Sequence, residues 1–168
     1  MNLMDLAPLA AAPFTYREIG ATAGELPDGY HHARESAVIG RGRERFESAG
    51  AKVMRWGMLR GAGLGVTASS EVADVGSVVI VRLGPVAAPS RVVYVVDDDN
   101  ERGFAYGTLR GHAESGEEKF AVRYDPVTDE VHAEVTAFSR HATWWSKAVA
   151  PLTSLLQRVV MKRYLSAV

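Results

Sequence analysis

The sequence predicts an α+β fold in which a curved antiparallel sheet of about seven strands packs around a long C-terminal helix. Six strand-like runs follow one another between residues 64 and 138, and the turns between them are too short for crossover helices. One helical pattern precedes these runs and a longer one follows them. Neighbouring runs can also be aligned so that their apolar faces coincide, as a sheet with one buried face requires.

The first 13 residues predict a short arm that precedes a single domain over residues 14–168. The arm is mildly apolar, but it lacks a basic leader region, and Asp5, Pro8 and Pro13 interrupt it, so we do not expect a signal peptide. No internal repeat or low-complexity linker divides the rest of the chain, and its length suits one domain.

Two strands and a helix are expected at the start of the domain. Phe14–Ile19 alternates aromatic and polar residues and predicts a first strand, and Tyr30–Ile39 predicts a second, short one. From Gly42 onward apolar residues recur at intervals of three and four, which is typical of an amphipathic helix that ends at Gly57. These residues are Phe46, Ala49, Val53 and Trp56.

Six further strands are predicted to form a meander. Their expected bounds are Leu64–Val72, Ser77–Leu83, Arg91–Asp97, Gly103–Leu109, Glu117–Tyr124 and Val131–Phe138. If Tyr124 lies opposite Val131, then Glu118 lies opposite Ala137 and the apolar faces of the last two strands coincide. Extended to the preceding strand, the same face gains the side chains of Phe104, Tyr106 and Thr108. We therefore expect a concave face that is lined with aromatic rings and carries one carboxylate, Glu118.

A long helix is predicted from about residue 142 to residue 165. Its apolar stripe is expected to face the sheet and comprises Trp145, Ala148, Leu152, Leu155, Leu156 and Val159. Pro151 should kink or divide this helix because proline cannot donate the helical hydrogen bond. Replacing Leu152 with alanine is expected to cost about 2–5 kcal/mol of stability, as for other buried leucines.

This order of elements resembles the helix-grip fold of START-type lipid-binding domains and Bet v 1-like plant allergens. The resemblance is one of topology, and it implies a cavity between the sheet and the last helix. Such cavities usually hold apolar ligands.

A second resemblance rests on particular residues. The run RGFAYGTLRGHAESGEEKF at 102–120, the sequence FSR at 138–140 and the basic, aromatic segment at 157–165 resemble uncharacterised protein family 0548. The chain departs from the family at Arg110 and His141, where proline is usual. The family has no established activity, so the resemblance supplies no catalytic residues.

Composition excludes several classes of function. A formal net charge of −1 does not suit a broad nucleic-acid interface. The chain has no cysteine, so disulfides, thiolate catalysis and cysteine-based metal sites are excluded, and a cytoplasmic location is expected. No run approaches the roughly 18 apolar residues of a transmembrane helix.

We expect neither a metal nor a cofactor. The histidines are scattered, and their spacing matches no common metal motif. Asp97–Asn100 resembles the start of a calcium loop but lacks the required glycine, so it predicts a solvated turn. The basic C-terminal residues Arg158, Lys162 and Arg163 fit a solvated helix face, with contact to anionic lipid as the alternative.

Glu118 is the most informative polar residue because a buried carboxylate must be paired, hydrogen-bonded or protonated. Arg140 and Arg91 are the candidate partners. One interpretation is a structural ion pair, and the other is a polar anchor or acid–base group at the mouth of a cavity. His112, in a glycine-flanked loop, is either a turn residue or a proton shuttle.

The predicted function is the binding of a small hydrophobic or amphipathic molecule between the sheet and the last helix. The candidate ligand-binding residues are Tyr30, Trp56, Tyr94, Phe104, Tyr106, Thr108, His112, Glu118 and Arg140. One alternative is a cyclase- or hydrolase-like enzyme that uses Glu118, Tyr106 or His112 for acid–base chemistry. Another is an interaction module with a filled core and no ligand.

Overall fold

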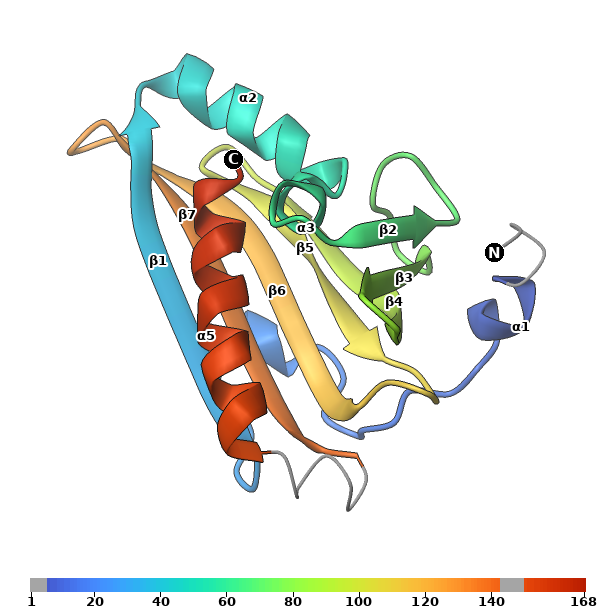
Figure 1. Cartoon of the computed structure of the whole chain (residues 1–168). Helices are drawn as coiled ribbons and strands as arrows, with labels where there is room; N and C mark the ends of the chain where they lie inside the picture. The colour runs from blue at the N-terminus through green and yellow to red at the C-terminus, as the bar shows by residue number, and fades with distance from the viewer. Residues whose placement is uncertain (1–5, 143–149) are drawn as a thin grey trace.

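The computed structural model describes the backbone of residues 6–142 and 150–168, and the side chains of residues 6–142 and 158–168. Figure 1 shows a strongly curved sheet with helices against its inner side. The helical segments are α1 (Ala7–Ala10), η2 (Ala21–Ala23), α2 (Arg43–Met54), α3 (Gly57–Gly61) and α5 (Ala150–Ser166). The strands are β1 (His31–Arg41), β2 (Gly65–Ala68), β3 (Val78–Leu83), β4 (Val86–Asp97), β5 (Glu101–Thr108), β6 (Glu114–Asp125) and β7 (Glu130–His141).

The predicted antiparallel sheet is confirmed. Its seven strands have the order β1-β7-β6-β5-β4-β3-β2, so strands 2 to 7 form a meander. The first strand pairs with the last, and the chain crosses through α2 and α3 to the opposite edge before the meander begins. The predicted register of the last hairpin is also confirmed, with Tyr124 opposite Val131 and Glu118 opposite Ala137.

One predicted strand is wrong. Phe14–Ile19 makes a single isolated bridge, from Phe14 to Leu109, and then turns across the outer side of the sheet. The alternation there arises because Tyr16 packs on the sheet while its neighbours are more exposed, not because the segment pairs as a strand. The expected short strand near Tyr30 is the long edge strand β1.

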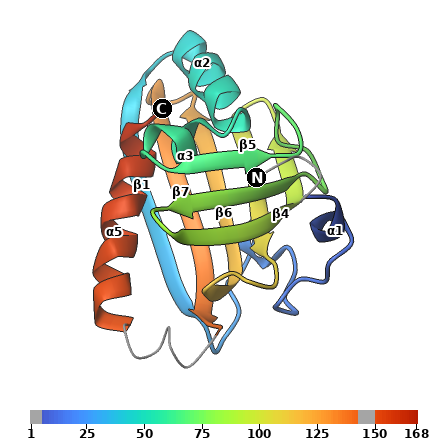
Figure 2. The same ribbon diagram turned by 45° about the vertical axis from the view of Figure 1, so that its right-hand side comes forward.

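Apolar clusters lie on both faces of the sheet. The concave face, against α2, α3 and α5, carries the main core, which includes Phe46, Phe104, Phe120 and Val135. The convex face carries a smaller cluster built on Tyr16, Leu26 and Phe138. Figure 2 shows how far the sheet curls: β2, β3 and β4 cross in front of the long strands β5, β6 and β7.

Helix α2 buries the side predicted for it, with Phe46, Ala49 and Val53 fully buried against β5 and β6. The helix ends at Met54, slightly before the predicted end. Trp56 then takes a left-handed φ of 65°, which is unusual for a large residue and turns the chain into α3. The indole is buried, and its Nε1 donates to the Ser70 carbonyl at 3.0 Å.

Helix α5 lies beside β1 and β7 and contacts α3 (Figure 1). Its buried residues within the described side chains are Met161, Tyr164 and Leu165, followed by Val168 after the helix. Val159 is 41% exposed, so the predicted apolar stripe is wrong at this end: the helix turns Val160 and Met161 to the core instead. The other predicted stripe residues lie outside the described side chains, and any kink upstream of Pro151 falls on residues outside the described backbone.

The segment before Phe14 packs against the outer side of the sheet. Leu6 is buried against Val78 and Ile80. The Arg91 guanidinium donates to the carbonyls of Leu9, Ala10 and Ala12 at 2.6–3.0 Å. Arg91, a candidate partner for Glu118, therefore holds the N-terminal segment.

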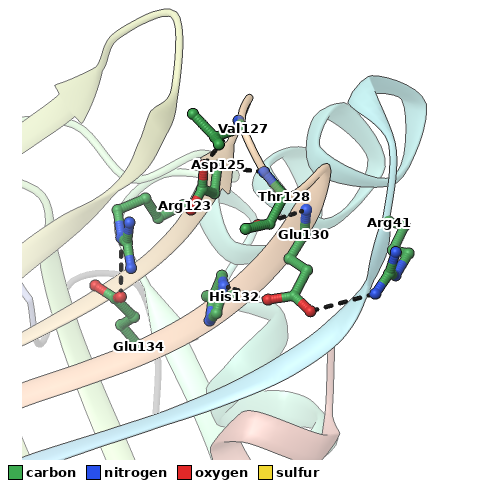
Figure 3. Close-up of polar contacts among 8 residues, drawn as sticks. All are labelled: Arg41, Arg123, Asp125, Val127, Thr128, Glu130, His132 and Glu134. Atoms are coloured by element: carbon green, nitrogen blue, oxygen red, sulfur yellow. Dashed lines mark hydrogen bonds and ion pairs between the residues drawn. The ribbon is translucent and has the colours of Figure 1, made fainter.

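The β6–β7 turn and its flanking strands carry a set of surface ion pairs (Figure 3). Arg123 pairs with Glu134 at 3.0 Å, and Arg41 pairs with Glu130 at 3.4 Å. The Asp125 carboxylate accepts a hydrogen bond from the Val127 amide at 2.8 Å. Exposed pairs of this kind usually contribute less than about 1 kcal/mol, so they assist the register that core packing specifies.

Candidate functional site

The register places Glu118 in the middle of a row that crosses the concave face. From β1 to β4 this row reads Ala33, Ala137, Glu118, Tyr106 and Val92. Two small side chains stand on one side of the carboxylate, and a phenol stands on the other. The carboxylate therefore projects from the face that also carries the main apolar core.

Within the described part of the chain, Glu118 has one side-chain hydrogen bond. The Tyr106 hydroxyl donates to its Oε2 at 3.1 Å. Burial raises the pKa of the Glu118 carboxyl to about 7, the Tyr106 hydrogen bond opposes that shift, and the charge of Glu114 adds to it. No lysine, arginine or histidine among the described residues forms an ion pair with Glu118. At neutral pH the carboxyl is therefore divided between its charged and neutral forms.

Aromatic rings surround this row. Phe120 is the centre of the cluster, with ring centroids 5.2 Å from Tyr106, 5.4 Å from Phe104 and 5.2 Å from Tyr164. Trp56 stacks edge-on to Phe104 at 5.0 Å. Such tilted and edge-to-face contacts add about 0.5–1.5 kcal/mol per pair to the burial of the rings. The structure thus brings together four of the predicted site residues, namely Trp56, Phe104, Tyr106 and Glu118.

Tyr164 is a member of this site that the sequence analysis missed. It is buried on α5, and the charge of Glu118 is close enough to raise the pKa of its hydroxyl. Burial raises the pKa values of Tyr106 and Tyr164 well above the usual range, so both phenols stay neutral. The position of Tyr164 three residues after Met161 was the signal that could have assigned it to the buried side of α5.

Ser90 was missed for a different reason. Its hydroxyl is buried on β4, next to the Val92–Tyr106 row, and has no hydrogen-bond partner among the residues that the structure describes. Nothing in its local sequence distinguishes it from a surface serine. It pairs in register with Thr108, whose Oγ1 accepts from the Gly116 amide at 3.0 Å and contacts the Thr15 hydroxyl at 2.5 Å. Thr108, a predicted site residue, is therefore engaged at the end of β5.

His112 lies in the β5–β6 connection, as predicted. Its Nδ1 accepts a hydrogen bond from the Glu114 amide at 3.0 Å, and burial lowers the pKa of the ring to about 4. A neutral imidazole that accepts from the backbone stabilises the turn. This geometry fits the turn-residue interpretation of His112.

Three predicted site residues lie on the convex face, away from Glu118. Tyr94 follows a bulge in β4 and pairs with Ala105, whose neighbours Phe104 and Tyr106 point to the other face. Tyr30 packs on the convex-face residue Phe138 at 5.0 Å. The Arg140 guanidinium lies 4.9 Å from the Tyr30 ring. The expected Glu118–Arg140 pair is therefore wrong, because Arg140 stands three residues from Ala137 and strand alternation directs it to the opposite face.

The convex face holds a second buried carboxylate, Glu117, which is fully provided with donors. The Tyr16 hydroxyl donates to Oε2 at 2.6 Å, and the amides of Gly20 and Thr22 donate at 2.7 and 3.0 Å. The Thr22 hydroxyl donates as well. Because this carboxylate is enclosed and satisfied, it fastens the segment around Tyr16 to the sheet and is closed to a ligand.

Two hollows of about 510 and 680 Å³ open beside the β4–β5 turn. Their walls are largely charged and include Arg43, Asp98, Asp99 and Asn100. Among the residues that the structure describes, no group of three or more acidic, histidine or cysteine side chains is arranged to hold a metal ion. Within the same part of the chain, no helix is long and apolar enough to cross a membrane.

Comparison with known proteins assigns the sequence and the fold. The domain of unknown function DUF1990 matches residues 15–167. A UPF0548 protein of Deinococcus radiodurans is 30% identical over 165 residues, which covers 89% of this chain and 83% of that protein. A UPF0548 protein of Arabidopsis thaliana is 32% identical over 143 residues, covering 78% and 68%. The resemblance found in the sequence is thereby confirmed.

Solved structures share the fold at low sequence identity. A hypothetical protein of Helicobacter pylori matches with a TM-score of 0.61 and 8% identity, covering 92% of this chain and 95% of that one. Norcoclaurine synthase from Thalictrum flavum, in complex with dopamine and hydroxybenzaldehyde, matches with a TM-score of 0.53 and 14% identity, covering 92% of each chain. The predicted helix-grip, Bet v 1-like fold class is confirmed.

Proposed function

The chain belongs to the DUF1990 (UPF0548) family, and we propose that it binds a small apolar or amphipathic molecule between the concave face of the sheet and α5. Glu118 and Tyr106 form the polar end of this site. The rings of Phe104, Phe120 and Tyr164 supply apolar contact area.

The observation that carries the proposal is the position of Glu118 on the core side of the sheet. The residue is partly buried, has one hydroxyl partner among the described residues and is flanked by the small residues Ala33 and Ala137. A protein that needed only a packed core would place an apolar side chain here, because burying a carboxylate is costly. A polar group set among apolar walls is instead the usual composition of a small-molecule site.

The fold adds support of a weaker kind. In norcoclaurine synthase the same architecture holds two small aromatic molecules, as the complex with dopamine and hydroxybenzaldehyde illustrates. Similarity of fold does not carry a substrate from one protein to another. It does support the more general idea that a protein of this fold can bind small molecules.

Acid–base catalysis is the second candidate function. A carboxyl with a pKa of about 7 exchanges protons readily at neutral pH, and a neutral phenol stands 3.1 Å away. Enzymes often hold an acid and a base in this way. Binding is our first proposal and catalysis the second, because binding needs only the contacts already described.

A steric block tests the binding proposal. The probe is the neutral aryl alcohol 4-phenylbutan-1-ol, and the readout is the amide spectrum of 15N-labelled protein. We expect shifts at Tyr106, Glu118 and Ala137 and none at Glu134 on the convex face. Ala137→Phe should place a ring beside Glu118 that obstructs the ligand, and so abolish the shifts.

Thr136→Phe is the matched control, since it adds the same ring to the other face of β7. It should leave binding intact. Shifts confined to the convex face, or binding that survives Ala137→Phe in a folded protein, would contradict the proposed site. Native mass spectrometry of freshly purified protein provides a parallel search for a molecule carried from the host cell.

A further inference from the structure

We infer that the natural ligand carries a protonated amine, whose ammonium group is held by the Glu118 carboxylate beside the rings of Tyr106 and Tyr164. This inference rests on the proposed function and names the class of molecule that the site accepts. It follows from the absence, among the described residues, of a positively charged side chain paired with Glu118.

Other partly buried carboxylates of the described chain have donors or cations. Glu117 accepts from the Tyr16 hydroxyl and from Gly20 and Thr22. Glu101 pairs with Lys119, and Glu134 pairs with Arg123. The chain thus compensates these groups wherever its own residues can reach them.

Glu118 departs from this rule. Among the described residues, its hydrogen bond comes from a neutral phenol, and the charge that raises its pKa is the negative charge of Glu114. Tyr164, from α5, is neutral and cannot supply a cation. The residue opposite Glu118 on β7 is Ala137, which has no polar side-chain atom. No cation of the described residues therefore compensates the ionised form of Glu118, and a positively charged group on a ligand at the proposed site would do so.

The neighbouring groups favour ammonium over the other ligand classes. An anionic group would be repelled by the ionised Glu118 carboxylate. A neutral alcohol would leave the carboxylate charge uncompensated in an apolar setting. An ammonium gains a charge-assisted hydrogen bond, and aromatic rings nearby add cation–π attraction.

The test compares three probes of one shape: 4-phenylbutylamine, 4-phenylbutan-1-ol and 4-phenylbutanoate. Calorimetric titrations at pH 8 keep the amine protonated and Glu118 ionised. The amine should bind at least about tenfold more tightly than the alcohol, which corresponds to one charge-assisted hydrogen bond. The carboxylate probe should bind most weakly.

Glu118→Gln removes the negative charge of the side chain and keeps its shape. The variant should bind the amine no better than the alcohol. Glu134→Gln removes the same charge from the convex face and should change neither affinity.

Proton release gives a second readout that a structural role of Glu118 would not produce. Binding of the ammonium should favour the ionised carboxyl, so at pH 7 about half a proton should leave per amine bound. Titrations in two buffers of different ionisation enthalpy measure this number. The alcohol should release none.

The outcomes distinguish the two levels of the proposal. If alcohol and amine bind equally well and Ala137→Phe blocks both, the site stands and the amine inference is overturned. If the amine binds tightly but Glu118→Gln leaves its affinity unchanged, the inference is also overturned. If none of the three probes binds, the proposed function fails together with the inference.

Discussion

Glu117 and Glu118 are consecutive in β6, yet their carboxylates lie on opposite faces of the sheet in opposite electrostatic situations. Glu117 accepts hydrogen bonds from the Tyr16 hydroxyl at 2.6 Å and from two backbone amides. Glu118 accepts one from Tyr106 at 3.1 Å. The Glu117 carboxylate stabilises the fold. The Glu118 carboxylate destabilises the fold when it is ionised, and it remains available for a further interaction.

Glu117→Gln should therefore lower stability. The glutamine side chain would point its NH2 group at hydrogen-bond donors, where the Glu117 carboxylate presents an acceptor oxygen. The charge-assisted hydrogen bonds to Glu117 would also be lost. We expect a loss of about 2–3 kcal/mol in urea unfolding. Glu134→Gln on the surface is the control, with a loss below about 1 kcal/mol. Equal losses of stability for both variants would mean that the hydrogen bonds to Glu117 contribute no more than an exposed ion pair does.

Glu118→Gln should stabilise the protein, and increasingly so as the pH rises. The folded carboxyl has a pKa of about 7 against an ordinary value of 4.5, so the folded state holds its proton more tightly than the unfolded state. The wild-type protein therefore loses stability between about pH 4.5 and pH 7, by up to about 3 kcal/mol. The difference between variant and wild type should be small at pH 4 and largest at pH 8 in urea titrations. A difference that does not change with pH would contradict this assignment.

His112 should stay neutral until the pH falls to about 4, because burial lowers the pKa of its ring to that value. NMR of the ring protons measures the titration directly, and the urea-unfolded protein should titrate near the ordinary value of about 6.5. A lowered folded pKa means that acid favours unfolding: stability from this group is present above about pH 6.5 and is lost as the pH falls toward 4. A folded-state titration near 6.5 would show that the ring is solvated.

Gly107→Ala should detach the segment around Tyr16 from the convex face. A methyl group at Gly107 would lie 2.2 Å from the Tyr16 hydroxyl and 2.9 Å from the Phe14 ring, so both side chains must move. The hydrogen bond from Tyr16 to Glu117 would break. Limited proteolysis should then cut between residues 14 and 23 faster than in the wild type. Gly65→Ala, where the nearest atom is at 3.4 Å, should leave the rate unchanged.

The orientation of α5 can be tested with two residues. Leu165 is 7% exposed, so Leu165→Ala should cost about 2–5 kcal/mol. Val159 is 41% exposed, so Val159→Ala should change stability by no more than about 0.5 kcal/mol. Chemical denaturation of both variants gives the comparison. The opposite order would restore the apolar stripe predicted from the sequence.

The sequence by itself determined the meander and the sidedness of its strands. Short turns exclude parallel connections, and alternation places Phe104, Tyr106, Phe120 and Glu118 on one face in the observed register. These are local properties, since each depends on a period of two residues and a turn of a few. The same period also directs the Arg140 side chain away from the face of Ala137 and Glu118. The sequence itself therefore contains the pattern that contradicts the expected Glu118–Arg140 pair.

The tertiary structure alone decided which residues meet from distant parts of the chain. A bulge between Val92 and Tyr94 adds one residue to β4 and so turns the Tyr94 side chain to the convex face. No short-range sequence pattern predicts this bulge. Tyr16 reaches Glu117 across 101 positions because an irregular segment packs over the sheet instead of joining it. Tyr164 reaches the Glu118 site only through the docking of α5. Alternation constrains neighbours within a strand, whereas contacts between remote segments depend on how the whole chain lowers its exposed apolar surface.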